Sequence, residues 1–302
     1  MKKVSLIILQ IAIAVIIAIA LITAPNKSVI LKIIDLIGMF CAGFNVAILI
    51  TKTEDSNLLF FSFCSINTKM EVIYISTYVM SDIHGQYTLF GKMLQKINFS
   101  QEDQLYIVGD IIDRGPKNLK MIERVFSTSN IHMIMGNHEQ MALDYFTYRD
   151  SYDREMWFNN GGNQTYKEIC ESDKWFINDI KKLFEELPYK VEISVNGRNY
   201  VLTHSYPFTE YKEDIVWHRI DLNSDFSEHT KENTTYIVGH TPIPYFTSTR
   251  AENKIYKSED GNVWFIDYGC AYMSSIYENN YGQMGCVRLD DEKLFLIDEE
   301  TK

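Results

Sequence analysis

The sequence QLYIVGDIIDRGP, residues 104–116, runs from an apolar segment into a polar loop bounded by two glycines. Gln104–Val108 has the composition of a strand, and a helix is predicted over Pro116–Phe126 because proline is favoured in the first helical turn. Outward from this segment, strand-like runs at 72–79 and 131–135 and a helically spaced apolar stretch at 89–97 continue the alternation. This βαβαβ order predicts an α/β domain with parallel strands, and ligands are expected beyond the carboxyl ends of those strands.

Charge is distributed unevenly along the 302 residues. Residues 1–69 hold six of the 29 basic and three of the 40 acidic residues, which leaves 23 and 37 in residues 70–302, a net charge of −14. Such an acidic body repels a phosphate backbone, so no nucleic-acid partner is expected. A phosphate-ester substrate would need local positive charge, for which metal ions are the obvious source. The five cysteines lack CxxC spacing and indicate reduced, mostly buried thiols.

Residues 1–69 are predicted to form a hydrophobic helical segment ahead of a catalytic domain over 70–302. Val4–Ala24 would reach about 31 Å as a helix, enough to cross a bilayer core. Val29–Ile50 contains charged and polar residues and is interpreted either as a second span or as a buried or interfacial helix. Flanking lysines and the thiol content favour a cytoplasmic catalytic domain, anchored to the membrane by residues 4–24 and, in a hairpin, by 29–50.

Two other interpretations of the N-terminal segment stay open. A cleavable signal peptide is disfavoured, because the apolar run is longer than usual and Ile22-Thr23-Ala24 is a poor cleavage site. Alternatively, the domain begins at Met70, and the upstream residues are an over-extended reading frame.

Polar motifs follow each predicted strand. In Ser81-Asp82-Ile83-His84-Gly85, an acid and a histidine two residues apart can bind one cation. In GDIIDRGP, residues 109–116, two carboxylates and a guanidinium are costly to bury without a purpose; the structural alternative is a helix-capping loop with an internal ion pair.

The third motif is Gly136-Asn137-His138-Glu139. Its amide oxygen suits a hard divalent ion, its histidine can ligate or transfer a proton, and Glu139 lies where it favours the helix dipole. Downstream, His204 and His240 each follow a strand-like run and complete two coordination spheres rich in nitrogen and oxygen. The other histidines are interpreted as structural or surface residues: His132, His218 and His229.

The ordered motifs Asp-x-His, Gly-Asp-x-x-Asp-Arg-Gly, Gly-Asn-His-Glu, His and Gly-His resemble those of the calcineurin-like metallophosphoesterases, in particular the phosphoprotein phosphatase branch. The similarity covers about residues 71–298 and is strongest to compact bacterial and phage Ser/Thr phosphatases and to symmetrical dinucleoside tetraphosphate hydrolases. It implies a metallophosphoesterase-type β-sandwich flanked by helices around the βαβαβ core.

The resemblance also implies roles for individual residues. One metal ion would be held by Asp82, His84 and His240, and a second by Asn137 and His204, with Asp110 bridging the two. Arg114 and Arg219 would bind phosphoryl oxygens, and His138, oriented by Asp113, would protonate the leaving oxygen. Asp267 is expected to be structural, and no residue matches the tyrosine that some relatives place near the phosphate.

The implied reaction is phosphoric monoester hydrolysis by in-line attack of a metal-bound hydroxide, with two divalent ions as cofactors: Mn²⁺ first, and Fe, Zn or Ni as alternatives. The leading hypothesis is a protein serine/threonine phosphatase acting on a phosphoprotein or a small phosphate ester. The alternatives are a symmetrical bis(5'-nucleosyl)-tetraphosphate hydrolase and a membrane-tethered inactive binding protein. The oligomeric state stays open.

A predominantly helical, aromatic cap is expected at about 152–188, where the strand pattern is interrupted. Its aromatic residues are Trp157, Phe158, Tyr166, Trp175, Phe176 and Phe184. Core packing is the favoured interpretation, and a wall that selects the leaving group is the alternative.

Overall fold

The computed structural model describes residues 46–53, 56–65, 75–173, 177–272 and 282–298. The chain divides into two compact units, residues 1–75 and 76–302. In the first unit, strand β1 (Val46–Thr53) pairs antiparallel with β2 (Ser56–Ser65).

Within the described ranges, no helix is long and apolar enough to cross a bilayer. The predicted span Val4–Ala24 lies outside them, and so do residues 29–45 of the second stretch. The last five residues of that stretch, 46–50, belong to β1, so the helix predicted as far as Ile50 is wrong over this part. Alternate β-branched residues there favour a strand, and pairing with β2 satisfies its backbone.

The first sheet of the second unit is built around the predicted βαβαβ segment. Its elements are β3 (Thr77–Met80), α3 (Tyr87–Lys96), β4 (Gln104–Ile107), α4 (Asn118–Phe126) and β5 (Ile131–Met133). Strands β3, β4 and β5 run parallel, as the sequence pattern predicts. Two later strands, β11 (Met284–Arg288) and β12 (Lys293–Ile297), extend the sheet antiparallel in the order β12-β11-β3-β4-β5.

The second sheet has the strand order β6-β7-β8-β10-β9. Its strands are β6 (Lys190–Val195), β7 (Arg198–Thr203), β8 (Thr234–Val238), β9 (Tyr256–Lys257) and β10 (Val263–Phe265). Strands β7, β8 and β10 are parallel, while β6 and β9 pair antiparallel at the two edges.

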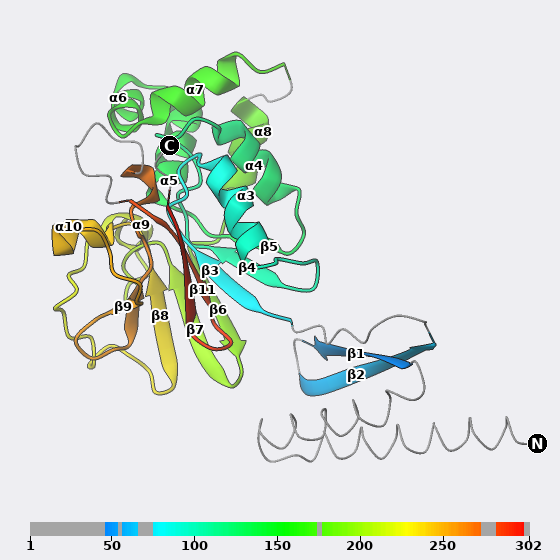
Figure 1. Cartoon of the computed structure of the whole chain (residues 1–302). Coiled ribbons are helices and arrows are strands. Elements are labelled where there is room, and N and C mark those ends of the chain that lie inside the picture. The colour runs from blue at the N-terminus through cyan, green and yellow to red at the C-terminus, as the bar shows by residue number, and fades with distance from the viewer. Residues whose placement is uncertain (1–45, 54–55, 66–74, 174–176, 273–281, 299–302) are drawn as a thin grey trace, which may run out of the picture. The chain divides into compact units, whose positions relative to one another are not determined.

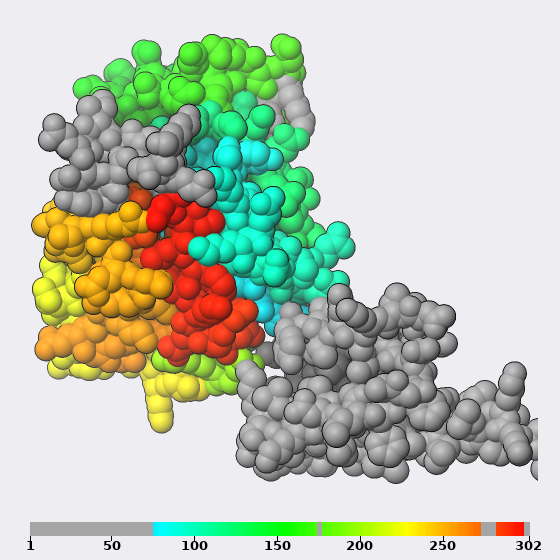
Figure 2. Space-filling view, viewed as in Figure 1, coloured from blue at the N-terminus to red at the C-terminus, as the bar shows by residue number. Residues whose placement is uncertain are grey.

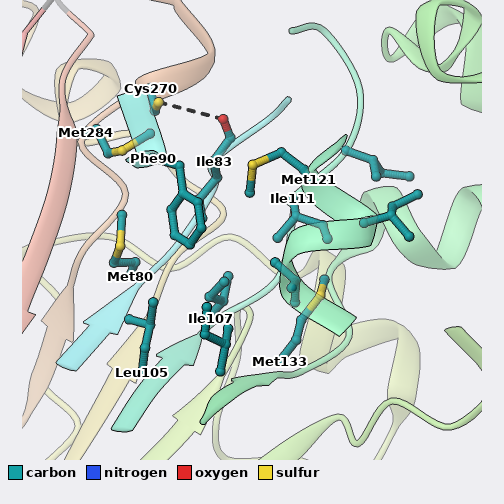
Figure 3. Packing of buried hydrophobic residues seen from close by; sticks show 14 of the residues in the cluster. Met80, Ile83, Phe90, Leu105, Ile107, Ile111, Met121, Met133, Cys270 and Met284 are labelled. Carbon is teal, nitrogen blue, oxygen red and sulfur yellow. Dashed lines mark hydrogen bonds between the residues drawn. The ribbon is translucent and has the colours of Figure 1, made fainter. Parts of the chain in front are cut away.

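Alternate residues of the first sheet face two different cores. Tyr78 and Met80 of β3 pack on the helix side, whereas Val79 between them packs with residues of the second sheet. Leu105 and Ile107 of β4 also lie on the helix side, beneath Phe90 of α3 (Figure 3). Two sheets therefore share one core, and α3 and α4 cover the outer face of the first sheet (Figure 1).

The remaining helices follow β5. They are α5 (Asn137–Tyr148), α6 (Ser151–Asn159), α7 (Gly162–Cys170), α8 (Ile177–Glu185), α9 (Lys212–Trp217) and α10 (Ile243–Thr247), with a 3-10 turn η1 at Cys270–Tyr272. Along the chain, α5 to α8 connect the first sheet to the second, and α9 and α10 lie between strands of the second sheet. The stretch predicted as a helical cap contains α6, α7 and α8, and α6 and α7 form the green surface at the top of Figure 2. Trp157 and Phe184 are fully buried, whereas Trp175 and Phe176 lie outside the described residues.

Candidate active site

The predicted site residues lie at the carboxyl ends of parallel strands from both sheets. The loop after β3 holds Asp82 and His84, and the loop after β4 holds Asp110 and Asp113. Asn137 and His138 begin α5, directly after β5 and its loop. His204 follows β7, and His240 follows β8. Strands that run parallel end at the same edge of a sheet, so this topology gathers five separate segments of the chain.

Several of these loop positions adopt the left-handed backbone conformation that is uncommon for residues other than glycine. The φ angles are 53° at Asp82, 46° at His84, 57° at Asp110, 72° at Asp113, 62° at Arg114 and 67° at His240. Non-glycine residues in this region concentrate at functional sites, where the surrounding structure compensates for their strain. Here the sharp turns immediately after the strands bring short polar side chains back over the strand ends.

Asp110 lies at the centre of the site. Its Oδ1 accepts the backbone N–H of His138 at 3.0 Å, which leaves Oδ2 directed toward imidazoles. The Nε2 atoms of His204, His84 and His138 lie 3.4, 3.8 and 3.9 Å from that oxygen. All four side chains are buried.

Backbone carbonyls set the tautomers of two of these histidines. His84 donates its Nδ1–H to the carbonyl of Ile112 at 2.9 Å, and His204 donates its Nδ1–H to that of Val108 at 2.8 Å. In the neutral form of both rings the lone pair therefore lies on Nε2, the atom that faces Asp110 and could bind a metal ion.

Asn137 joins the two histidines that come late in the chain. Its Oδ1 lies 2.9 Å from His204 Nε2 and 3.0 Å from His240 Nδ1. These contacts place His240 beside Asn137 and His204. The grouping implied by the resemblance instead placed His240 with Asp82 and His84, although Asp82 Oδ2 does accept the backbone N–H of His240 at 3.0 Å.

Burial and mutual charge perturb the acid–base properties of the site. Burial raises the pKa of Asp82 to about 7 and lowers the pKa of His240 to about 3 and that of His84 well below its usual range. Burial also opposes the charge on His204 and Asp110, but their mutual attraction outweighs it. The pKa of His204 rises to about 10, and the pKa of Asp110 falls well below its usual value.

The side chains present fit divalent metal ions. His204 Nε2 faces the oxygens of Asn137 and Asp110, so a neutral ring would point its lone pair at two acceptors, and the position requires a proton or a metal ion. Two groups each bring one ligand atom per residue within 4.8 Å of one another: Asp82, Asp110 and His204; and His84, Asp110 and His138. Carboxylate, imidazole and amide oxygen donors are typical of Mn²⁺, Fe and Zn²⁺ sites.

His138 belongs to the second group by distance but is held by a different partner. Its Nδ1 lies 2.6 Å from Oδ2 of the fully buried Asp113. Its Nε2 is buried and has no hydrogen-bond partner among the described residues. The imidazole therefore presents one unpaired nitrogen toward Asp110 while the other is fixed by a carboxylate, an arrangement suited to proton transfer.

The predicted phosphate-binding arginines lie at the exposed edge of the site. Arg114 Nη1 is 3.2 Å from His84 Nε2, and the guanidinium lies over the ring of Tyr272, 5.7 Å from its centroid. Arg219 Nη1 donates to the hydroxyl of Thr241 at 3.4 Å. Both arginines are exposed residues, so they are accessible to an anion.

Glu139 has a role that the sequence did not reveal. Its carboxylate accepts the backbone N–H groups of Asp110 at 2.9 Å, Ile111 at 3.0 Å and Ile112 at 3.4 Å. The side chain is fully buried and holds the loop in which Asp110 adopts its left-handed conformation. The sequence signal for this role was an acid directly after the Asn-His pair. It was interpreted through the helix dipole alone, and so was not connected with the loop at residues 109–116.

Asp267 lies nearby with its carboxylate turned toward its own loop, where Oδ1 accepts the backbone N–H of Gly269 at 2.8 Å. The remaining described histidines contact other parts of the molecule. His132 bonds to Gln104, and His218 and His229 pack against Tyr206 and Phe208.

Comparison with known proteins places this geometry in a family. The family model for calcineurin-like phosphoesterases matches residues 75–273. The chain is 32% identical to serine/threonine-protein phosphatase 2 of Salmonella typhimurium over 196 residues, which cover 61% of this chain and 87% of that relative. It is 40% identical to the symmetrical bis(5'-nucleosyl)-tetraphosphatase of Buchnera aphidicola over 178 residues, covering 49% of this chain and 61% of that protein.

A solved structure of a putative diadenosine tetraphosphatase shares the fold, with a TM-score of 0.51 at 14% identity over 75% of this chain and 95% of that one. Because a family model spans more than half of the chain, and the motif residues form groups that could hold metal ions, the protein belongs to the calcineurin-like phosphoesterases and is a hydrolase.

Proposed function

We propose that the protein is a metal-dependent protein serine/threonine phosphatase with a dinuclear metal centre. The observation that carries this proposal is the position of Asp110 Oδ2, which faces the Nε2 atoms of His204, His84 and His138 at 3.4 to 3.9 Å. The ions would be held by Asp82, His84, Asp110, Asn137, His204 and His240, with Asp110 shared. When bound, divalent ions lower the pKa of a coordinated water and neutralise charge on the phosphoryl oxygens.

Residues of the chain perform the remaining steps. Asp113 accepts the Nδ1–H of His138, so the transferable proton is carried on Nε2 of that ring and passes to the departing oxygen. Arg114 and Arg219 hold the phosphoryl oxygens through guanidinium N–H groups, which match the geometry of phosphate.

Two observations support a phosphoprotein substrate. The chain covers 87% of the length of the phosphatase relative but only 61% of the tetraphosphatase. In addition, residues 70–302 carry a net charge of −14, which opposes binding of a polyanionic dinucleotide. The symmetrical tetraphosphatase remains the second candidate, because the Buchnera relative is 40% identical over the aligned part.

A substrate panel tests the proposal. The full-length protein with added Mn²⁺ is assayed on a phosphoserine peptide, p-nitrophenyl phosphate and diadenosine tetraphosphate, with Asp110→Asn as the inactive control. We expect the phosphopeptide to be preferred. A preference of more than about a hundredfold for the tetraphosphate, roughly 2.7 kcal/mol, would reverse the order of the two candidates.

A further inference from the structure

Asp113 is held by the cap helices as well as by its histidine partner. Its Oδ2 accepts hydrogen bonds from His138 Nδ1 at 2.6 Å and from the indole Nε1 of Trp157 at 2.8 Å. Its Oδ1 accepts the hydroxyl of Thr165 at 2.5 Å, and the same hydroxyl accepts the backbone N–H of Asp113 at 3.1 Å. Trp157 belongs to α6 and Thr165 to α7, so each of these two helices supplies one donor.

The residues that make these contacts are buried. The exposed fractions are 0% for Asp113 and Trp157 and 1% for His138 and Thr165. A buried carboxylate requires donors at its oxygens, and the directions of those donors determine the plane that it adopts. The indole and the hydroxyl therefore fix the carboxylate plane independently of the imidazole that it orients.

We propose that Trp157 and Thr165 are positioning residues for the catalytic acid. They hold the Asp113 carboxylate in the plane that directs Nε2 of His138 toward the leaving oxygen. The inference rests on the proposed function, in which His138 donates that proton. It gives the cap a role in proton transfer beyond core packing.

The turn between α6 and α7 also holds the neighbouring arginine. The carbonyl of Gly161 accepts the backbone N–H of Arg114, and the carbonyl of Asn160 accepts its Nε–H, both at 3.3 Å. Gly161 has φ +103°, and a Cβ there would lie 2.7 Å from Cγ of Arg114. A Cβ at Gly162 would lie 2.3 Å from Nε1 of Trp157. A side chain at Gly161 would therefore collide with Arg114, and one at Gly162 would collide with the indole of Trp157.

Packing and hydrogen bonding by Trp157 can be separated. Its ring packs edge-on against Phe146, with centroids 5.3 Å apart, and lies 5.8 Å from the ring of Tyr145. Trp157→Phe would keep one aromatic ring there but remove the indole N–H together with the rest of the fused five-membered ring, so it is compared below with a control that loses the same ring. Valine at position 165 would likewise keep the shape of threonine and remove the hydroxyl.

The test compares leaving groups in the full-length protein. Trp157→Phe and Thr165→Val are assayed on a phosphoserine peptide, which has a poor leaving group, and on p-nitrophenyl phosphate, which has a good one. A misdirected acid should cost at least about tenfold more rate on the peptide, because general-acid help typically contributes ~10²–10⁴-fold and matters most for poor leaving groups. Thr165→Ser, which restores the hydroxyl, should recover the peptide rate. Equal losses on both substrates would overturn the inference.

Matched controls come from the second sheet. Trp264 and Thr235 are fully buried, and within the described part of the chain Nε1 of Trp264 and Oγ1 of Thr235 have no hydrogen-bond partner. Trp264→Phe and Thr235→Val should change both rates by the same factor. A selective loss of peptide rate in these controls would show that destabilisation alone produces the effect, which contradicts a specific role for Trp157 and Thr165.

A spectroscopic measurement provides a readout besides activity. In ¹H–¹⁵N spectra of the metal-free protein, the indole signal that disappears in Trp157→Phe should exchange slowly with solvent and shift in Asp113→Asn. An unshifted signal would overturn the contact.

His138→Asn separates this inference from the proposed function. If His138→Asn loses more rate on the peptide than on p-nitrophenyl phosphate, while Trp157→Phe and Thr165→Val do not, only the positioning role is wrong. If His138→Asn loses the same rate on both substrates, both the positioning role and the proposed role of His138 are wrong.

Discussion

The carboxylate of Glu139 accepts the backbone N–H of Asp110 at 2.9 Å, so the acid that follows the Asn-His pair supports the loop that carries the central carboxylate. Glu139→Gln replaces one of the two acceptor oxygens with an amide N–H₂ group, which would face a backbone N–H donor of this loop. We expect a loss of about 1–3 kcal/mol in the free energy of unfolding, because buried donors lose their acceptor. Urea unfolding in the presence of chelator measures this without a metal contribution. The exposed Glu186→Gln is the control and should change stability by less than about 0.5 kcal/mol.

Removal of metal should abolish activity and lower stability together. An ion that binds only the folded protein stabilises it by about 2.7 kcal/mol at a concentration one hundred times its dissociation constant. Treatment with a chelator should therefore stop hydrolysis of p-nitrophenyl phosphate and lower the thermal unfolding midpoint, and Mn²⁺ should restore both. Full activity after exhaustive chelation would contradict the metal mechanism.

Asp110→Asn should be among the most damaging substitutions, because Asp110 belongs to both candidate ligand groups. We expect a rate loss of more than about 100-fold, since even residues that only support metal ligands cost about 10–100-fold when changed. Metal content measured beside the rate should fall as well. The exposed Asp173→Asn is the charge-matched control and should retain both. Near-normal rate and metal content in Asp110→Asn would exclude a bridging role.

His138→Asn should retain metal, and the size of its loss of activity should depend on the leaving group. The structure pairs His138 Nδ1 with Asp113, which favours acid catalysis over ligation. Loss of a general acid typically costs ~10²–10⁴-fold and should be far larger on phosphoserine than on p-nitrophenyl phosphate. His204→Asn and His240→Asn should instead lose metal and slow both substrates alike. Loss of metal from His138→Asn would make it a ligand.

Arg219→Ala should weaken substrate binding more than it slows the chemical step. The guanidinium lies over the ring of Tyr245, with Cζ 5.6 Å from its centroid, and contacts Thr241, which neighbours His240. Steady-state kinetics should show a raised KM that Arg219→Lys partly restores, because lysine keeps the charge but not the bidentate geometry. An unchanged KM in Arg219→Ala would remove this residue from the phosphate site.

Local patterns in the sequence were sufficient for the βαβαβ core. Apolar runs of strand length predicted the strands that the structure shows as β3, β4 and β5. Helical spacing at 89–97 and the proline at the start of 116–126 predicted α3 and α4. These patterns are set by neighbouring residues, so they can be read without knowledge of the fold. The same reasoning was wrong at residues 46–50, where apolar composition suits either a helix or a strand and pairing with β2 decides the outcome.

By itself, the sequence also determined which residue types carry the chemistry, because the carboxylates, amide and histidines occur in recognisable motifs after strands. Only the tertiary structure decided how they meet. Asn137 contacts His240 across 103 positions of sequence, and Trp157 and Thr165 reach Asp113 across 44 and 52. Such contacts depend on the packing of two sheets and the cap helices, and on left-handed turns at Asp110 and Asp113. No local pattern encodes them, because the energy that stabilises each turn comes from partners distant in the chain.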